Sequence, residues 1–140
     1  MNKGFSVSQI IDRPPDEVWA YLVEFRNAPQ WMTGVDGLEQ VSDGPLGVGA
    51  ELAFKSRGKV RGSVVSAFEP ERRLDLTSTQ GGITASYSYS LAPRDGATEL
   101  TLSANCEAKG LWKILHPLIK IAMEKSDSSH VSNIATAMEG

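Results

Sequence analysis

The sequence has one cysteine and only two histidines, and this scarcity excludes several kinds of site. Cys106 has no partner for a disulfide within the chain, as is typical of a reducing compartment. Together with His116 and His130 it does not make a metal-ligand set, so we expect no metal. The glycines do not form a phosphate-binding loop between a strand and a helix. We therefore expect no cofactor.

Basic residues are also scarce relative to acidic ones. The chain has 14 Lys and Arg against 17 Asp and Glu, so its net charge is −3 and nucleic acid is not an expected partner. No apolar run reaches the roughly 20 residues of a membrane span, which excludes stable membrane insertion. The opening MNKGFSVSQ lacks the apolar core of a signal peptide. These absences predict a soluble, cytoplasmic protein, and they leave open whether it is a monomer or a homodimer.

Alternation of apolar and polar residues dominates the middle of the chain. In ITASYSYSL, residues 83–91, Tyr87 and Tyr89 point to the same side as the aliphatic residues, and the serines point to the other. Short turns separate the alternating segments, so the strands are expected to be antiparallel. The 140 residues are expected to form one domain, residues 1–140, whose core is large enough to need no disulfide or structural metal. Seven strands are predicted, at residues 5–12, 38–43, 51–57, 60–69, 73–79, 83–91 and 98–107.

Two regions of helical periodicity flank these strands. RPPDEVWAYLVEF, residues 13–25, has proline and acidic residues at its start, followed by Val18 and Leu22 at helical spacing. PQWM at 29–32 predicts a second short turn of helix. From Leu111 onward, apolar residues recur on one helical face. This predicts a long amphipathic C-terminal helix that covers one face of the sheet.

Several short motifs occur in a characteristic order along residues 5–140. They are Pro15 with Glu17-Val18-Trp19, Pro29-Gln30-Trp31, Gly47 and Gly49, Glu69-Pro70-Glu71 with Leu74, Tyr89-Ser90-Leu91-Ala92-Pro93, and the closing segment from Asn133 to Glu139. In order and spacing the chain resembles the START-like, Bet v 1-like (SRPBCC) superfamily, in particular its polyketide cyclase/dehydratase branch. The resemblance implies an α+β helix-grip fold. In that fold a seven-stranded curved antiparallel sheet wraps around a long C-terminal helix, and two short helices follow the first strand.

The resemblance also implies a cavity of a few hundred Å³ between the sheet and the long helix, the size of a small-molecule site. Family members hold lipids, polyketides or other hydrophobic molecules there. Two tyrosines on one apolar face support a pocket, because a buried phenol needs a hydrogen-bond partner. A solid core formed by the same residues is the alternative. The candidate ligand-binding residues are Trp31, Phe54, Val64, Leu76, Tyr87, Tyr89, Leu102, Trp112, Leu115, His116, Ile119 and Met123.

Three functions follow from this reading. The first is binding of a small hydrophobic or amphipathic molecule, such as a lipid or polyketide. The second is a polyketide cyclase/dehydratase-type enzyme acting on a ligand in the same cavity. No catalytic residue is assigned: His116 is the candidate considered, a histidine at the edge of the core is its alternative, and His130 carries less weight. Asp75 alternates outward, so no carboxylate is expected inside, which ranks binding above catalysis. The third function is a protein-interaction module.

Four basic residues surround one predicted hairpin. Alternation predicts that Lys55, Arg57 and Arg61 lie together on a face exposed to solvent, with Lys59 in the turn. An acidic partner, or an anionic ligand group at the rim of the cavity, is the alternative. Cys106 is predicted to be a buried thiol on the inner face, because no histidine lies near it in the sequence.

Overall fold

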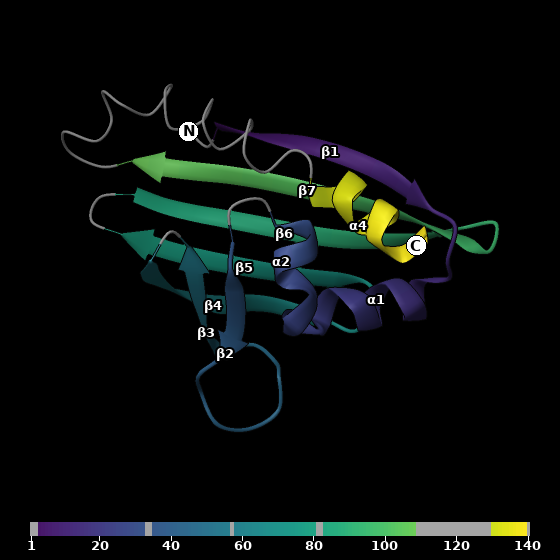
Figure 1. Cartoon of the computed structure of the whole chain (residues 1–140). Coiled ribbons are helices and arrows are strands. Elements are labelled where there is room, and N and C mark those ends of the chain that lie inside the picture. The colour runs from purple at the N-terminus through teal and green to yellow at the C-terminus, as the bar shows by residue number, and fades with distance from the viewer. Residues whose placement is uncertain (1–2, 33–34, 57, 81–82, 109–129, 140) are drawn as a thin grey trace.

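The computed structural model describes residues 3–32, 35–56, 58–80, 83–108 and 130–139 (Figure 1). One strand comes first, a short helical region follows it, and six more strands and a final helix complete the described chain. The elements are β1 (Lys3–Ile11), α1 (Pro15–Val23), the 3-10 turn η1 (Phe25–Asn27), α2 (Ala28–Trp31), β2 (Gly37–Gln40), β3 (Glu51–Ser56), β4 (Lys59–Glu69), β5 (Arg73–Gln80), β6 (Ile83–Arg94), β7 (Ala97–Ala108) and α4 (His130–Glu139).

The strands form one seven-stranded antiparallel sheet in the order β1-β7-β6-β5-β4-β3-β2. Each strand from β2 to β7 pairs with its neighbour in sequence, as hairpins require, and β1 closes the order by pairing with β7. Helices α1, α2 and α4 lie on one side of this sheet (Figure 1). The prediction of seven antiparallel strands, with short helices after the first and a helix at the C-terminal end, is confirmed.

Helix α1 begins where the sequence predicts. Pro15 occupies the first helical turn, where the missing N–H removes no hydrogen bond, and Asp16 and Glu17 lie at the positive end of the helix dipole. Its buried face carries Val18, Trp19 and Leu22 onto the sheet. The Tyr21 hydroxyl donates to Oε1 of Gln30 at 2.8 Å, which ties α1 to α2.

The core lies between the inner face of the sheet and these helices. Facing residues on paired strands share a face, so Leu74 of β5, Tyr89 of β6 and Leu102 of β7 form a row across the sheet. All three are buried. The Trp19 ring packs edge-on against Phe68, with ring centroids 5.4 Å apart, and this contact anchors α1 on β4.

The outer face of the sheet is rich in hydroxyl side chains. They are the polar positions of the alternating strands, and several form hydrogen bonds across neighbouring strands. The pairs are Ser6–Ser103, Ser8–Thr101, Ser66–Thr77 and Thr79–Thr84, at 2.9 to 3.2 Å. The alternation observed in the sequence therefore separates an apolar inner face from a hydrogen-bonded outer one.

Strand β4 presents the opposite face from the one predicted. Val64 was expected inside, yet its side chain is 42% exposed, whereas Val65 is fully buried. Two adjacent valines fit either alternation, and pairing with the neighbouring strands decides between them. Val65 faces Leu76 of β5, which points inward. A register shift between Val65 and Ala67 then allows Phe68 to pack against the core as well.

Part of the predicted C-terminal helix lies outside the described residues. The candidate residues on this part are Trp112, Leu115, His116, Ile119 and Met123, and they remain predictions. Helix α4 is the portion that the structure describes, and it buries Val131, Ile134 and Ala135. No helix in the described ranges is long and apolar enough to span a membrane.

Candidate ligand-binding site

Three ring side chains from three elements meet under the sheet. Trp31 ends α2, Tyr89 lies in the middle of β6, and His130 begins α4. The Trp31 ring centroid is 5.5 Å from that of Tyr89 and 5.6 Å from that of His130, edge-on in both cases. The Tyr89 hydroxyl lies 3.3 Å from Nδ1 of His130. All three residues are buried, so an indole, a phenol and an imidazole lie together inside a core that is otherwise largely apolar.

Burial determines the charge state of the histidine in this cluster. Desolvation lowers the pKa of His130 from 6.5 to about 4, because the apolar surroundings penalise the charged imidazolium. The imidazole is therefore neutral at neutral pH, with one nitrogen as donor and the other as acceptor. Its contact with Tyr89 joins two groups that each donate or accept a hydrogen bond without carrying charge.

Trp31 brings a buried donor to the cluster. The residue is 2% exposed, and its indole Nε1–H has no hydrogen-bond partner among the described residues. Leaving such a donor without an acceptor costs about 1–3 kcal/mol. The main chain at this position is held firmly, because Asn133 Nδ2 of α4 donates to the Trp31 carbonyl at 3.2 Å. A ligand that offers an oxygen acceptor would satisfy the indole N–H.

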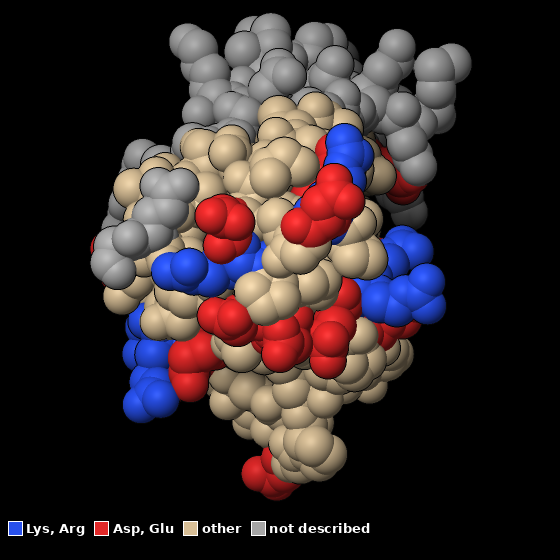
Figure 2. All heavy atoms as spheres, turned by 90° about the vertical axis from the view of Figure 1, so that its right-hand side faces the viewer, with Lys and Arg blue, Asp and Glu red and all other residues tan. Residues whose placement is uncertain are grey.

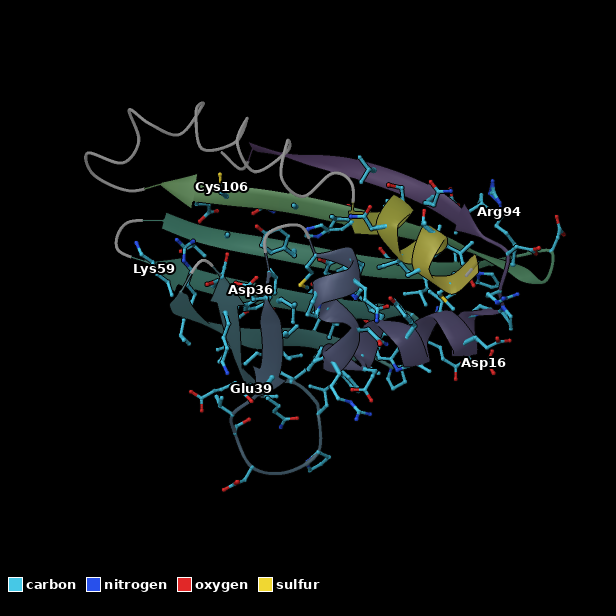
Figure 3. All side chains as sticks on the ribbon, in the orientation of Figure 1. Asp16, Asp36, Glu39, Lys59, Arg94 and Cys106 are labelled. Atoms are coloured by element: carbon cyan, nitrogen blue, oxygen red, sulfur yellow. The ribbon has the colours of Figure 1, made fainter. Side chains whose placement is uncertain are left out.

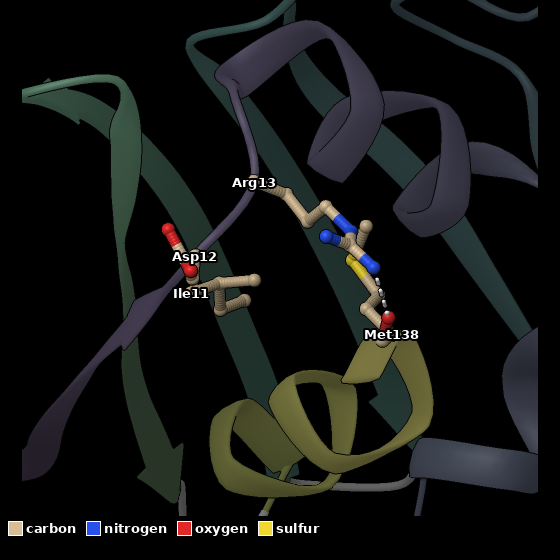
Figure 4. A pocket seen from close by; sticks show the side chains of 4 residues that line it. All are labelled: Ile11, Asp12, Arg13 and Met138. Atoms are coloured by element: carbon tan, nitrogen blue, oxygen red, sulfur yellow. Dashed lines mark hydrogen bonds between the residues drawn. The ribbon is translucent and has the colours of Figure 1, made fainter. Parts of the chain in front are cut away.

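Two surface pockets adjoin α4 in the described part of the chain. One of about 170 Å³ lies where β1 ends, and the Arg13 guanidinium crosses it to donate to the Met138 carbonyl at 3.2 Å (Figure 4). The other, of about 330 Å³, lies beside α2 and includes Trp31. Its lining residues are Pro29, Gln30, Trp31, Met32, Val35, Asp36 and Asn133. The cavity expected between the sheet and residues 109–129 stays a prediction.

The structure places most of the sheet residues expected at the site on the inner face. Leu76, Tyr89 and Leu102 are buried, and Phe54 and Tyr87 are partly buried against the core. Cys106 is buried on β7, as predicted. Val64 is the exception, since it points to the outer side of β4. Within the described residues, no group of three or more His, Cys, Asp or Glu side chains is arranged to hold a metal ion.

His130 is the residue that the sequence analysis undervalued. It lies in a serine-rich stretch and carried less weight than His116 as a candidate, but it is buried and contacts both aromatic residues. The signal was present in the spacing of Val131, Ile134, Ala135 and Met138, which recur at i, i+3, i+4 and i+7. His130 lies one turn before Ile134 and so shares this apolar face.

The sheet order, the short helices after β1 and the helix at the C-terminal end define a START/Bet v 1-type helix-grip fold. A model of the family described as "Polyketide cyclase / dehydrase and lipid transport" matches residues 3–139, and the chain belongs to this family. No curated protein matches the sequence.

Solved structures agree with this fold at low sequence identity. The Zhui aromatase/cyclase from Streptomyces sp. R1128 is 11% identical, with a TM-score of 0.78 over 99% of this chain and 94% of that one. A START superfamily protein from Mycobacterium smegmatis is 14% identical, with a TM-score of 0.77 over 96% of each chain. Ara h 8.0201 is 17% identical, with a TM-score of 0.71 over the whole of both chains. These similarities establish the architecture alone.

Proposed function

We propose that the protein binds a small hydrophobic or amphipathic molecule between the inner face of the sheet and the C-terminal helical segment. The observation that carries this proposal is the Trp31 indole N–H, a buried donor with no acceptor among the described residues, on a ring that packs edge-on against Tyr89. Small-molecule sites are typically apolar with a few such polar groups that orient the ligand. The family's description, which includes lipid transport, supports the same class of ligand.

Polyketide cyclase or dehydratase chemistry is the second candidate, and the Tyr89–His130 contact is the observation in its favour. A general base works best when its pKa lies near the operating pH, and the pKa of His130 is lowered to about 4. Asp75, near the start of β5, lies on the outer side and pairs with Arg73 at 2.6 Å. These two facts favour an orienting role for the cluster over proton transfer, so we rank binding first.

The test begins with native mass spectrometry of protein purified from its own host, followed by extraction of the bound molecule. A stoichiometric adduct that is released unchanged supports a carrier, and conversion of the adduct on incubation supports an enzyme. Protein that carries nothing and binds no hydrophobic probe contradicts both candidates.

Matched variants then locate the site. Trp31→Phe keeps an aromatic ring but removes the N–H, and we expect it to weaken binding by roughly fivefold to tenfold. Trp19→Phe is the control, because Trp19 is also buried but packs against Phe68 instead of the cluster. Equal effects of the two substitutions would contradict the role given to Trp31.

A further inference from the structure

Two cations stand on the inner side of the sheet at its β3–β4 end. Lys59 faces Ser56, and Arg61 faces Phe54, which packs against the core. Residues that face each other in an antiparallel pair share a side of the sheet, so Lys59 and Arg61 share the side of Phe54. Lys55 points to the opposite side. The prediction that Arg61 and Lys55 share a solvated face is therefore wrong, because the register places Arg61 in line with buried Ser63 and Val65.

Neither cation is neutralised by another described residue. Lys59 and Arg61 are exposed, and neither forms an ion pair with another residue in the described ranges. At the other end of the sheet, acidic and basic side chains are interspersed over the surface around the start of α1 (Figure 2). Arg94, at that end, lies 3.5 Å from Glu99. Figure 3 shows how far apart the labelled Lys59 and Arg94 lie along the sheet.

Burial on the inner face rises steadily away from the two cations. Along β4, Arg61 is exposed, whereas Ser63 and Val65 are buried. Arg61 and Val65 are separated by about 13 Å at the usual rise of a strand. Val65 faces Leu76, and Leu76 faces Tyr87, which lies two residues before Tyr89 on the inner side of β6. The inner face thus runs from an exposed cationic end to a buried aromatic end over a distance on the order of 20 Å.

We propose that the ligand is an elongated amphiphile with a carboxylate head, which pairs with Lys59 and Arg61 while its apolar body follows the inner face toward Tyr89. This inference rests on the proposed function and adds to it the charge and orientation of the ligand. Arg offers a fork of donors that matches a carboxylate, and Lys adds a second positive charge beside it. The apolar body gains from removal of its surface from water along Val65 and Leu76.

The experiment compares cis-parinaric acid, a fluorescent long-chain fatty acid, with its uncharged methyl ester. The wild-type protein is expected to bind the acid about tenfold more tightly than the ester at low ionic strength. The double variant K59Q/R61Q is expected to lose this preference and to keep its affinity for the ester. The control is Lys55→Gln, which removes a cation from the outer side of the same hairpin and is expected to leave the preference intact.

The possible outcomes separate this inference from the proposed function. Equal binding of acid and ester by the wild-type protein overturns the carboxylate assignment and leaves ligand binding standing. A preference for the acid that survives in K59Q/R61Q, or that disappears in K55Q, also overturns the assignment of the carboxylate to Lys59 and Arg61 and leaves ligand binding standing. Failure of both probes to bind contradicts the proposed function itself. A preference that added salt weakens, and that K59Q/R61Q abolishes, supports the inference.

Discussion

At the residue scale, the cluster of Trp31, Tyr89 and His130 departs most from ordinary core packing. It packs the Trp31 ring edge-on against Tyr89 and His130 and brings the phenol hydroxyl to 3.3 Å from the imidazole Nδ1, inside a largely apolar core. A buried polar group that lacks a hydrogen-bond partner costs stability, so such groups are rare in native proteins and each calls for an explanation. The reason proposed above is that these groups orient a ligand.

The buried His130 predicts a pH-dependent stability. Its folded-state pKa of about 4 lies below its ordinary 6.5, so the unfolded chain takes up the proton first as pH falls. The stability that this residue contributes is complete above pH 6.5 and is lost as pH falls toward 4, which amounts to about 3 kcal/mol. Urea unfolding at a series of pH values measures the loss. We expect His130→Gln, which cannot titrate, to have a flatter profile, and an unchanged slope would contradict this assignment.

The neutral Tyr89–His130 contact predicts a modest energetic effect when the hydroxyl is removed. Tyr89→Phe keeps the ring contact with Trp31 but deletes the group that lies 3.3 Å from Nδ1 of His130. We expect a loss of about 1–2 kcal/mol in the free energy of unfolding. Tyr21→Phe is the control, because its hydroxyl binds Gln30 at the surface. A larger loss in the control would show that the cluster contributes little.

At the element scale, β4 shows how strand pairing overrides a sequence pattern. The segment contains Val64 and Val65 side by side, so alternation alone does not say which of them is inside. Pairing with Leu76 and the register shift before Ala67 decide the matter. The register of β4 with β3 also places Arg61 on the inner side of the sheet, opposite to the side predicted. The proposal of an anionic ligand depends on this orientation of β4.

The orientation of β4 predicts unequal effects for two neighbouring substitutions. Val65→Ala removes buried methyl groups and is expected to cost about 2 kcal/mol of stability. Val64→Ala, at a position that is 42% exposed, is expected to cost about 0.5 kcal/mol. Urea unfolding of the two variants provides the measurement. Equal losses, or a larger loss for Val64→Ala, would show that β4 is turned the other way.

At the scale of the whole molecule, the sheet is covered by described helices over only part of its inner face. Helices α1, α2 and α4 pack near the aromatic cluster, and the β3–β4 hairpin lies toward the other end (Figures 1 and 3). One end of the inner face is thereby buried and neutral, and the other is exposed and cationic. This polarity is a property of the assembled sheet, because its two ends draw on residues from several strands.

A ligand that spans this inner face should stabilise the folded state as a whole. Binding to the folded chain alone adds about 2.7 kcal/mol when the free ligand is at a hundred times its dissociation constant. We therefore expect cis-parinaric acid to raise the midpoint of thermal unfolding in the wild-type protein, with a smaller rise in K59Q/R61Q. A midpoint that does not move at saturating probe would contradict binding to the folded state.

The strands, the start of α1, the inward placement of Tyr89 and Leu102 and the fold family could all be predicted from the sequence. These follow from alternation, helix-start chemistry and motif order, which depend on near neighbours in the chain. The face of β4, the side occupied by Arg61 and the burial of His130 became known from the folded chain. Each of these depends on pairing or packing with residues distant in sequence: Val65 with Leu76, Arg61 with Phe54, and His130 with Tyr89, 41 positions away. Local pattern cannot encode such partners where two alternations fit equally well, and there the register of the sheet makes the choice.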